Sequence, residues 1–543
     1  MAETTYNNII LIGFSGSGKS VVAQTVARRL GWQAIDTDDE IVKLAGKPIP
    51  DIFVQQGEER FREMENQVLQ QACAGSKTVI ATGGGAILNA GNREMMSRSG
   101  VVICLEAKPQ TIHRRLLQNT GGSSNGTQVR PLLMSPDPMQ RIEQLKSSRQ
   151  PYYAMADWTV HTDELSLEQV SEEVVRVWRY STQPACQVTT ATQQYPVFMG
   201  RSWLKRLGRE MRRSGLSGSA YIISDEMVFH LYGQRLSQML EDSGFKTGSY
   251  VVPPGETTKS LYTATAIYEF LAERHAERGD TVVALGGGMV GDLAGFVAAT
   301  YLRGMPLVQV PTSLVAMVDA SIGGKVAVNH PKAKNIIGAF YQPRLVLADI
   351  DVLSSLPHRE LVSGWAEVVK HGLILDAEYF RFLEQNVERL LRLEPETTTD
   401  AVARSAAIKA QIVSEDEKEQ GQRTLLNYGH TVGHGLEAAG GYERFLHGEA
   451  VAIGMMAAAF ISQRLGMIPA ELVERQSRLL EKLGLPTHCT DVDKQAVLTA
   501  MELDKKVQRK ATRWVLLEGL GRAVVRRDVP HNLVLAALDE VIQ

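Results

Sequence analysis

The sequence contains little cysteine. Its four cysteines, Cys73, Cys104, Cys186 and Cys489, are spread over 543 residues. They are too few for a disulfide framework and too scattered for a zinc site built from thiolates. We therefore expect a reducing compartment, the cytoplasm, for this chain.

Long apolar runs are also lacking. The run from Ala450 to Ile461 is shorter than the roughly 18 residues that suggest a membrane-spanning helix, and the run from Thr281 to Leu302 is interrupted by Asp292 and by consecutive glycines. The first apolar run, Ile9 to Ile12, has no basic segment before it and leads into a glycine-rich loop. We expect neither a membrane span nor a signal peptide.

An excess of basic charge is absent as well. The chain has 58 Lys and Arg against 61 Asp and Glu, a formal net charge of −3. Neither the part up to Tyr180 nor the remainder is a basic block, so we expect no binding to nucleic acid or to an anionic membrane surface. Any site for an anion has to be built from cations that cluster locally.

The hydrophobic pattern is that of a globular chain with several domains. Hydrophobic residues make up 44% of the sequence, and at about 150 residues per domain its length implies about three to four domains. Short β-rich runs alternate with helical patterns over 1–180 and again over 188–356, which is typical of parallel α/β sheets, whereas 357–543 is almost wholly helical. Residues 181–187 carry no charge and are expected to be a linker. The clearest expected strands are Ile9–Gly13, Val79–Thr82, Val101–Leu105, Ala220–Ser224, Thr281–Leu285, Leu307–Val310 and Leu345–Ala348.

A phosphate-binding loop follows the first expected strand. The segment Gly13-Phe-Ser-Gly16-Ser-Gly18-Lys19-Ser20 stands between this strand and an apolar-periodic helix, which is the context that such a loop requires. Its backbone N–H groups hold phosphate oxygens, Lys19 supplies a positive charge to the β and γ phosphates, and the Ser20 hydroxyl binds Mg²⁺. The sequence therefore predicts a site for ATP with Mg²⁺.

Two aspartates follow the next expected strand. Asp36 and Asp38 stand at its carboxyl end, the side on which ligands bind in open α/β sheets. Asp36 is a candidate to support the metal through water, and Asp38 is a candidate to accept a proton from a substrate hydroxyl. A helix N-cap explains one of the two aspartates equally well.

Further motifs continue this pattern through the N-terminal part. They are, in order, Asp36-Thr-Asp38, Phe61-Arg62, Gly83-Gly84-Gly85, Arg130-Pro-Leu-Leu and Arg149-Gln-Pro-Tyr-Tyr. Together they resemble the shikimate kinase family over residues 8–178. The resemblance implies that Asp38, the glycine turn, Arg62 and Arg149 hold shikimate, with both arginines on its carboxylate, and that Arg130 reaches ATP. A guanidinium grips a carboxylate with two hydrogen bonds, which a lysine does not.

The expected lid of this kinase has an unusual composition. The segment Asn119 to Val129 is rich in glycine and serine, uncharged and longer than the resemblance leads us to expect. Closure of a lid excludes the water that would otherwise hydrolyse ATP.

A second glycine-rich turn follows an expected strand in the C-terminal part. The segment Gly286-Gly-Gly288-Met-Val-Gly291 fits a dinucleotide fingerprint, although an ordinary glycine turn has the same residues. The acidic residue expected about 20 positions further on is absent, because Pro311-Thr312 stands there. Asp225, at the end of another expected strand, is the candidate to bind the ribose, and Glu256 and Lys259 are candidates to flank the cofactor.

Residues of metal-binding type gather in the helical part. They are Glu367, His430, His434 and His447. Three protein ligands leave one position of the metal open, as a catalytic zinc requires. Spacing alone places His430 and His434 on one helix face, which would permit both as ligands.

The complete set of motifs in the C-terminal part resembles a second family. The set comprises Pro253-Pro-Gly-Glu256-x-x-Lys259, Gly286 to Phe296 with Asp292, Arg303, Asp319, Gly323-Gly-Lys325, Lys334-Asn335, Glu367-x-x-Lys370, Lys409, Arg423-x-x-x-Asn427, His430-x-x-x-His434 and His447-Gly-Glu449. It resembles 3-dehydroquinate synthase across 188–543. The resemblance implies that Glu367, His430 and His447 bind Zn²⁺ or Co²⁺ and that His434 contacts the substrate and relays a proton. It also implies a homodimer formed through this part.

The same resemblance implies NAD⁺ as a recycled cofactor and 3-deoxy-arabino-heptulosonate 7-phosphate as the substrate. Its NAD⁺ residues are Asp225, Glu256, Lys259, Gly288, Asp292, Thr312, Ser313, Asp319, Lys325 and Lys334. Its catalytic residues are Lys325, Lys370, Lys409, Arg423, Asn427 and His434, and its further substrate contacts are Arg303, Asn335 and Lys505. A substrate with a phosphate and a carboxylate needs such a cluster of cations, because isolated buried charges are costly. The implied reaction returns its hydride, so no net oxidation occurs.

The sequence favours one hypothesis over two alternatives. A gluconate-type sugar kinase joined to a polyol dehydrogenase or another sugar phosphate cyclase has the same folds, but the paired arginines and the lysine cluster favour anionic substrates. A nucleotide-gated regulatory module without turnover is disfavoured by the intact Lys19, Asp38 and metal ligands. The favoured hypothesis is a bifunctional enzyme of aromatic amino acid biosynthesis. Its expected fold class is α/β: a P-loop kinase domain, a Rossmann-like α/β domain and an α-helical domain.

Overall fold

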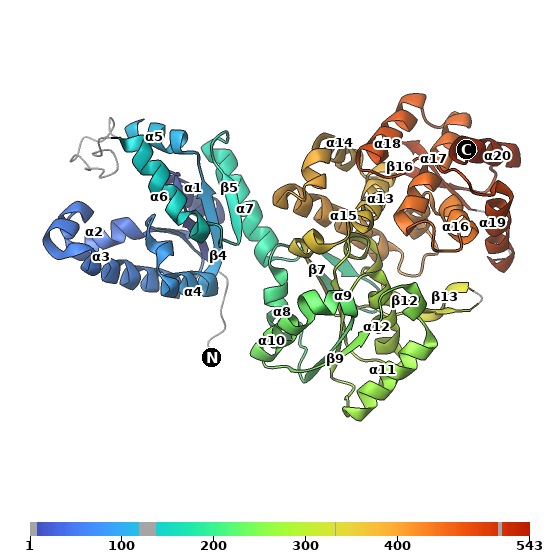
Figure 1. Cartoon of the computed structure of the whole chain (residues 1–543), viewed down its shortest axis with the longest axis horizontal. Coiled ribbons are helices and arrows are strands. Elements are labelled where there is room, and N and C mark those ends of the chain that lie inside the picture. Colours follow the sequence, from blue (N-terminus) through green and yellow to red (C-terminus); the bar gives the residue numbers. More distant parts are fainter. Residues whose placement is uncertain (1–7, 119–136, 332, 509–512) are drawn as a thin grey trace. The chain divides into compact units, whose positions relative to one another are not determined.

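The chain folds into two compact units, Met1–Gln183 and Pro184–Gln543 (Figure 1). The computed structural model describes residues 8–118, 137–331, 333–508 and 513–543, and only the backbone of 502–508. Helix α7 (Leu167–Thr182) ends the first unit and strand β6 (Cys186–Thr189) begins the second. Only residues 183–185 stand between them, so the connection is shorter than the linker expected at 181–187. No helix in the described ranges has the length and apolar character needed to span a membrane.

The first unit is built on a parallel sheet of five strands in the order β2-β3-β1-β4-β5. The strands are β1 (Asn8–Ile12), β2 (Gln33–Asp36), β3 (Thr78–Ala81), β4 (Gly100–Glu106) and β5 (Trp158–His161). Alternate residues of the central strand β1 enter two cores: Ile9 and Leu11 pack on the α1 and α7 side, and Ile10 and Ile12 on the opposite side. Burial on both faces explains why this strand is continuously apolar.

The helices of the first unit cover both faces of this sheet. They are α1 (Lys19–Leu30), α2 (Thr37–Ala45), α3 (Ile49–Ala74), α4 (Ala90–Ser99), α5 (Pro109–Gln118), α6 (Pro138–Tyr153) and α7, with a 3₁₀ turn η1 (Ala86–Leu88). Helix α1 begins directly after Gly18, whose φ is 101°, a value that favours glycine. At the start of α7, Ser166 and Gln169 form a capping box.

The second unit contains a sheet of seven strands in the order β6-β7-β14-β11-β10-β8-β9. Its strands beyond β6 are β7 (Gln194–Gly200), β8 (Ser219–Asp225), β9 (Lys246–Val252), β10 (Thr281–Gly286), β11 (Leu307–Pro311) and β14 (Leu345–Asp349). All neighbouring pairs are parallel except β6 with β7. The carboxyl ends of β7, β8, β10, β11 and β14 therefore meet at one edge of the sheet, where ligands bind in folds of this kind.

Short helices and one hairpin complete the α/β part of this unit. They are η3 (Trp203–Arg206), α8 (Leu207–Arg213), α9 (Glu226–Val228), η4 (Phe229–Gly233), α10 (Gln234–Asp242), η5 (Glu256–Thr258), α11 (Leu261–Glu273), α12 (Gly288–Thr300), η6 (Tyr301–Arg303), η7 (Ala316–Ala320), the hairpin β12 (Lys325–His330) and β13 (Ala333–Phe340), and η8 (Ile350–Ser355). Helices α11 and α12 pack on one face of the sheet, and η3, α8 and α10 pack on the other.

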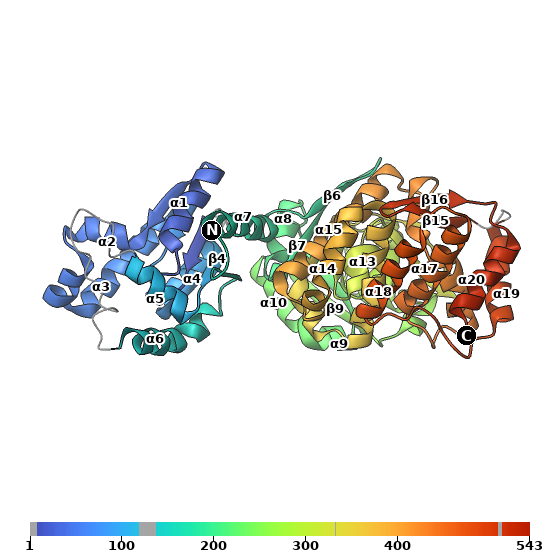
Figure 2. The ribbon, with the colours of Figure 1, turned by 90° about the horizontal axis from the view of Figure 1, so that it is seen from above.

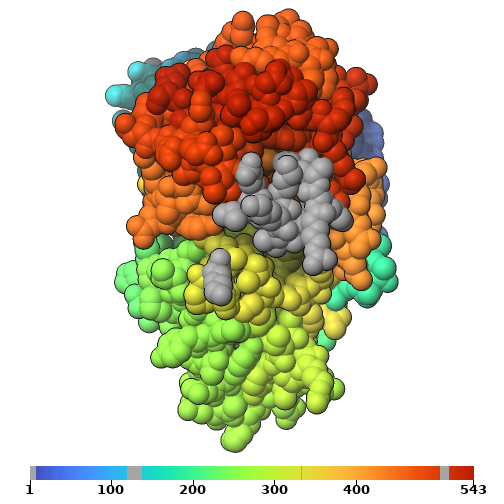
Figure 3. Space-filling model, turned by 90° about the vertical axis from the view of Figure 1, so that its right-hand side faces the viewer, coloured from blue at the N-terminus to red at the C-terminus, as the bar shows by residue number. Residues whose placement is uncertain are grey.

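The remainder of the second unit is helical except for one hairpin. It comprises α13 (His358–Leu375), α14 (Ala377–Leu391), α15 (Pro395–Glu415), η9 (Gln422–Asn427), α16 (His430–Ala439), α17 (His447–Arg464), α18 (Ala470–Lys482), α19 (Lys494–Gln508), the hairpin β15 (Trp514–Gly519) and β16 (Arg522–Arg526), and α20 (His531–Val541). The expectation of an almost wholly helical region missed this hairpin. In Figure 3 the helical part, orange to red, lies above the α/β part, green to yellow.

Three helices of this part are in very close contact. A Cβ atom on Gly448 of α17 would lie only 1.8 Å from the carbonyl oxygen of Ser363 in α13, and one on Gly454 would lie 2.0 Å from that of Gly429, which precedes α16. Figure 2 shows α13 and α17 side by side. Glycine at these positions thus lets the three helices approach closely enough to bring their polar side chains together.

Candidate active sites

The phosphate-binding loop of the first unit is already folded around its lysine. The buried Lys19 ammonium donates hydrogen bonds to the carbonyl oxygens of Gly13 at 2.9 Å and Phe14 at 3.0 Å. Positive φ angles at Gly13 (138°), Gly16 (84°) and Gly18 (101°) permit this turn. Burial lowers the pKa of Lys19, although the nearby charges of Asp38 and Asp36 oppose the shift. Ser20 is exposed in the first turn of α1.

The two aspartates after β2 have different surroundings. Asp36 caps helix α2, because its Oδ1 accepts a hydrogen bond from the backbone N–H of Asp38 at 3.0 Å. This is the N-cap arrangement that the sequence left open for one of the pair. Burial and the charge of Asp36 raise the pKa of Asp38 to about 6, against the opposing effect of Lys19. Asp38 therefore holds its proton more tightly than an ordinary aspartate does.

The glycine turn after β3 brings together the groups expected to hold the acceptor. Arg149 Nη1 donates to the carbonyl oxygen of Gly84 at 3.1 Å. A Cβ atom on Gly85 would lie 2.8 Å from Arg62 Nη1, and one on Gly83 would lie 2.7 Å from Asp38 Oδ1. Both arginines and Asp38 thus meet at a single turn that only glycine leaves open.

Sequence reasoning missed a buried glutamate in this cluster. Glu65 accepts a hydrogen bond from Arg62 Nη1 at 2.8 Å, and Glu58 accepts one from Nη2 at 3.2 Å. Burial raises the pKa of Glu65, although Arg62 opposes the shift. Its position three residues after Arg62 on a helix was a signal that could have identified it. Arg130 and the expected lid, Asn119 to Val129, lie outside the described residues.

The expected dinucleotide residues lie at the edge formed by the strand ends of the second unit. The backbone N–H of Thr312 donates to the carbonyl oxygen of Gly286 at 2.9 Å, linking the ends of β10 and β11. Asp225 ends β8 and caps the next helix, since its Oδ1 accepts from the backbone N–H groups of Met227 and Val228, each at 3.0 Å. A Cβ atom on Gly287 would lie 3.3 Å from Ser313 Oγ. The glycine turn is therefore closely packed against the segment after β11.

Several of the other expected cofactor residues form one polar cluster around Lys259. Its ammonium lies 2.5 Å from Asp292 Oδ2 and 3.9 Å from Glu256 Oε1, and it also donates to Asn335 Oδ1. Burial raises the pKa of Asp292 to about 6 despite the neighbouring Lys259. Lys334 points elsewhere, with its ammonium 4.2 Å from the centre of the Tyr442 ring.

Three expected metal ligands come together from three helices. The ligand atoms of Glu367, His430 and His447 all lie within 4.8 Å of one another. Nε2 of His430 is 3.7 Å and Nε2 of His447 is 3.6 Å from Oε1 of Glu367. Glu367 is fully buried; its Oε2 forms an ion pair with Lys370, and its Oε1 accepts no hydrogen bond within the described part of the chain. This set of unused donor atoms matches the ligand types of a divalent metal site.

In His430 and His447, the ring nitrogen Nδ1, which is not the one nearest Glu367, also has a polar neighbour. Nδ1 of His430 lies 3.2 Å from the carbonyl oxygen of Tyr428, and Nδ1 of His447 lies 3.5 Å from Oε1 of Glu437, a residue that sequence reasoning missed. Burial opposes a charge on His447, but the carboxylates of Glu367 and Glu437 raise its pKa to about 10. Partners of this kind orient metal-binding imidazoles.

His434 does not belong to this triad. It is exposed on α16, and its ring centre lies 5.4 Å from that of His430 and 6.4 Å from that of His447. The pairing of His430 with His434 that the helical spacing permitted is therefore not the arrangement in the structure. Helical spacing places two side chains on one face but does not determine where their ring nitrogens point.

A second acidic group adjoins the triad. Ligand atoms of Asp319, Glu367 and His371 also lie within 4.8 Å of one another. Lysine ion pairs run through this group, from Lys370 to Glu367 and from Lys409 to Asp319. Burial alone would raise the pKa of Asp319, but the Lys409 ammonium holds that pKa well below its ordinary value. Lys409 already neutralises Asp319, the carboxylate that distinguishes this group from the triad, which disfavours a second divalent ion here.

Several of the remaining expected substrate residues contact the acidic loop between α15 and η9, which contains Glu417 and Glu419. Lys325 forms an ion pair with Glu419, and Asn427 Nδ2 donates to Oε1 of Glu419 at 2.7 Å. Arg423 is buried, and its guanidinium donates to the carbonyl oxygens of Glu417 at 2.5 Å and Gly323 at 3.2 Å. Sequence reasoning missed Glu419, which belongs to no recognisable spacing. Arg303 is exposed on η6 and takes no part in these contacts, and the side chain of Lys505 lies outside the described residues.

The folds and sites define a two-part enzyme, a P-loop phosphotransferase joined to a Rossmann-like enzyme with a metal-binding helical part. Residues 15–179 match the family model of shikimate kinase. Residues 249–363 match that of the 3-dehydroquinate synthase N-terminal part, and 364–507 match that of the C-terminal part. The chain belongs to the 3-dehydroquinate synthase family and carries a shikimate kinase domain before the synthase. It is therefore a bifunctional shikimate-pathway enzyme, as the sequence predicted, and the two alternatives are not favoured.

Individual relatives and solved structures agree with this assignment. The 3-dehydroquinate synthase of Nostoc punctiforme is 46% identical over 354 residues, which cover 65% of this chain and 98% of that protein. The synthase of Methylococcus capsulatus is 48% identical over 347 residues, 64% of this chain and 96% of that protein. A solved 2-deoxy-scyllo-inosose synthase, complexed with carbaglucose-6-phosphate, NAD⁺ and Co²⁺, is 28% identical with a TM-score of 0.60 over 65% of this chain and 99% of that one. ValA, the 2-epi-5-epi-valiolone synthase of Streptomyces hygroscopicus with NAD⁺ and Zn²⁺ bound, is 28% identical with a TM-score of 0.60 over 64% of this chain and 96% of that one.

Proposed function

We propose that the first unit phosphorylates shikimate with ATP and that the second converts 3-deoxy-arabino-heptulosonate 7-phosphate into 3-dehydroquinate and phosphate. The convergence of Glu367, His430 and His447 from three helices is the observation that carries the second half of this proposal. The family models support both halves, and the curated relatives support the second. The domains we propose are 1–180 for the kinase, 188–356 for NAD⁺ binding and 357–543 for metal and substrate binding.

In the kinase, the residues at the glycine turn have two roles, substrate binding and proton transfer. Arg62 and Arg149 bind the carboxylate of shikimate, and Asp38 accepts the proton of the hydroxyl that is phosphorylated. Its pKa of about 6 leaves it ionised at neutral pH yet basic enough for this task. Lys19 neutralises the phosphates of ATP, and Ser20, with Asp36 through water, binds Mg²⁺. Arg130 is proposed to contact ATP from the lid.

In the synthase, Glu367, His430 and His447 are the residues that would hold Zn²⁺ or Co²⁺, and their unused donor atoms support this role. When bound, the ion polarises a substrate hydroxyl and NAD⁺ provides a reversible hydride acceptor. The exposed His434 relays the proton of that hydroxyl. Residues proposed to bind the phosphate and carboxylate are Lys325, Lys370, Lys409, Arg423, Asn427, Arg303, Asn335 and Lys505. They stabilise the departing phosphate electrostatically.

The proposed NAD⁺ residues lie at the carboxyl ends of neighbouring strands. They are Asp225, Glu256, Lys259, Gly288, Asp292, Thr312, Ser313, Asp319, Lys325 and Lys334. The order β11-β10-β8 in the sheet supports a shared site for those that follow these strands. Lys334 is the weakest member, because its side chain contacts Tyr442 instead.

Location and assembly are also part of the proposal. Four free cysteines support a cytoplasmic location. A homodimer formed through the C-terminal part, and no association with nucleic acid, are predictions that light scattering and a filter-binding assay test. Because the product of one unit is not the substrate of the other, we propose no direct transfer between the two sites.

The decisive experiment measures both products on the full chain. Phosphate release from the heptulosonate phosphate is expected to require NAD⁺ and a divalent metal, and ADP formation is expected to require shikimate and ATP. Glu367→Ala should abolish phosphate release and leave ADP formation intact, and Lys19→Ala should do the reverse. Each variant is thus the control for the other. Phosphate release that survives metal removal would contradict the proposal.

A further inference from the structure

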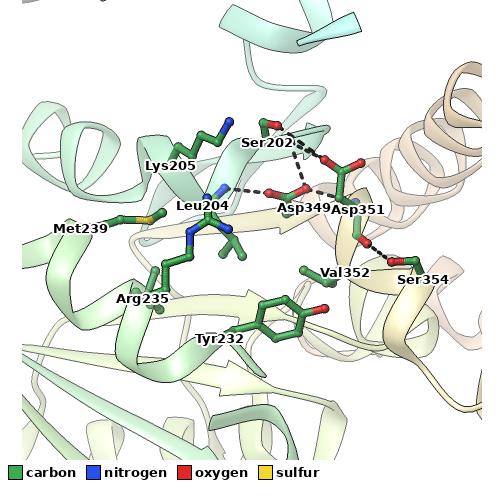
Figure 4. A pocket seen from close by; sticks show the side chains of 11 residues that line it. Ser202, Leu204, Lys205, Tyr232, Arg235, Met239, Asp349, Asp351, Val352 and Ser354 are labelled. Atoms are coloured by element: carbon green, nitrogen blue, oxygen red, sulfur yellow. Dashed lines mark hydrogen bonds between the residues drawn. The ribbon is translucent and has the colours of Figure 1, made fainter. Parts of the chain in front are cut away.

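A pocket of about 290 Å³ lies in the second unit at the carboxyl ends of β7 and β14 (Figure 4). Its walls come from the turn η3, the segment η4–α10 and the turn η8. None of the residues that line it belongs to the sets placed above in substrate, metal or NAD⁺ binding. The pocket is therefore separate in its residues from the machinery of the synthase.

The two acidic residues of the pocket are already satisfied. Asp349 is buried, and its carboxylate accepts hydrogen bonds from the backbone N–H groups of Ser202 at 3.0 Å, Leu204 at 3.0 Å and Asp351 at 3.1 Å. Asp351 accepts from Arg201 Nε at 2.7 Å and from the backbone N–H of Ser202 at 3.2 Å. Both carboxylates therefore already accept several hydrogen bonds from the protein itself.

The two basic residues of the pocket, in contrast, have no polar partner in the described part of the chain. Lys205 and Arg235 form no hydrogen bond or ion pair with any residue that the structure describes. Figure 4 shows both of them on one side of the pocket, with Asp349 and Asp351 on the other. Both are exposed side chains at the rim of the pocket, so a ligand there meets two positive charges that have no ion-pair partner in the described part of the chain. The guanidinium of Arg235 has the geometry for a bidentate carboxylate.

The rest of the wall is largely apolar. It includes Leu236, Met239 and Val352, and the ring of Tyr232, whose hydroxyl is taken up by a hydrogen bond to Ser355 Oγ at 2.7 Å. An apolar wall beside unpaired cations suits an anion with an apolar body, because hydrophobic contact and charge pairing then act on the same ligand. A bare phosphate would leave this wall uncovered. An α-amino acid would bring an ammonium whose nearest acceptors, Asp349 and Asp351, already accept hydrogen bonds from the protein.

We infer that this pocket binds a small organic carboxylate with an aromatic or branched apolar body, held by Lys205 and Arg235. The proposal is tested by titration calorimetry on the full chain with 3-phenylpropionate as the probe. L-Phenylalanine, which adds an ammonium to the same body, and inorganic phosphate, which lacks the body, are the comparison ligands. We expect saturable binding of 3-phenylpropionate. We expect at least about tenfold weaker binding of L-phenylalanine, because its ammonium loses water without gaining an equivalent partner, and of phosphate, because it makes no contact with the apolar wall.

Variants locate this binding. Arg235→Gln and Lys205→Gln are each expected to weaken 3-phenylpropionate at least about tenfold. The matched controls Arg478→Gln and Lys246→Gln change exposed cations outside the pocket and should leave affinity unchanged. Met239→Trp fills the cavity and should abolish binding without altering any charge. Basal phosphate release should persist in all five variants, which shows that they are folded.

Three outcomes would overturn the inference. The first is an absence of saturable 3-phenylpropionate binding. The second is an affinity for 3-phenylpropionate that is the same in Arg235→Gln as in Arg478→Gln. Binding of L-phenylalanine or phosphate to the unmodified chain as tightly as 3-phenylpropionate would count equally. The third is competitive displacement of the probe by NAD⁺, which would make the pocket part of the dinucleotide site.

Discussion

Oε1 of Glu437 lies 3.5 Å from Nδ1 of His447, on the side of the imidazole opposite Glu367. One glutamate thus faces each nitrogen of the ring. Glu437 comes from α16, whereas His447 begins α17, so the contact also ties the two helices together. A carboxylate in this position sets the tautomer of a metal-binding histidine and raises its basicity.

Glu437→Gln is expected to weaken metal binding by about 10- to 100-fold, because an amide orients the imidazole less strongly than a carboxylate does. The measurement is a competition titration with a chromogenic chelator, paired with phosphate release at limiting metal. Glu443→Gln changes an exposed glutamate nearby and serves as control. Unchanged metal affinity in Glu437→Gln would show that the 3.5 Å contact has no orienting role.

Arg62→Lys and Arg149→Lys are each expected to raise the KM for shikimate by about 10- to 100-fold, the equivalent of about 1.5–3 kcal/mol for a charge-assisted hydrogen bond. Lysine retains the charge but not the two-pronged geometry. ADP formation at varied shikimate concentration measures the effect. Arg60→Lys, on the same helix but exposed and paired with Glu63, is the control. Normal KM values in both variants would remove the arginines from the acceptor site.

Kinase activity should depend on the ionisation of Asp38. Its pKa is raised to about 6 from the ordinary 3.8, so the carboxylate becomes protonated as the pH falls through 6 and the proposed base is lost. The kcat/KM for shikimate should therefore fall about tenfold per pH unit below that value and level off above it. Asp38→Asn should be nearly inactive at every pH. A profile that stays flat down to pH 5 would exclude this carboxyl as the base.

Gly448→Ala should destabilise the second unit, because the new Cβ would lie 1.8 Å from the carbonyl oxygen of Ser363. Overpacking of this kind costs about 1–3 kcal/mol. It should also shift the adjacent His447 and reduce metal affinity. Denaturant unfolding in the presence and absence of metal measures both effects. Gly279→Ala, where a Cβ meets nothing within 4 Å, should be neutral.

The strands that the sequence predicted share one physical property. Those such as β1 and β10 are buried along their whole length and read as uninterrupted apolar runs. Strand β2 at the sheet edge has two polar residues among its four and is not buried, so it lacks this property although a strand was expected before Asp36. The first four residues of β15 are buried and apolar, but they stand in a region whose pattern is otherwise helical, and the hairpin β15–β16 was missed. Strand β2 pairs with the distant β3, and local hydrophobicity does not record such a contact.

The candidate sites likewise contain residues that the sequence reveals and residues that it does not. Residues with a motif, such as Lys19 and Glu367, were recognisable because their chemistry demands a fixed local spacing. Glu437 and Glu419 were not, because each acts on a side chain that folding brings to it from another element. Glu65 is intermediate, since its partner Arg62 is only one helical turn away. What the sequence could not supply was the set of partners that orient or neutralise the recognisable groups.

The short connection between α7 and β6 has a consequence for how such a chain can arise by gene fusion. Each sheet has its own interior on both faces, and no strand is shared across residues 183–185. A gene divided at this point would cut no β-ladder and open no core. Two separate open reading frames could therefore encode the same pair of catalysts, and fusion changes their stoichiometry in the cell to one to one.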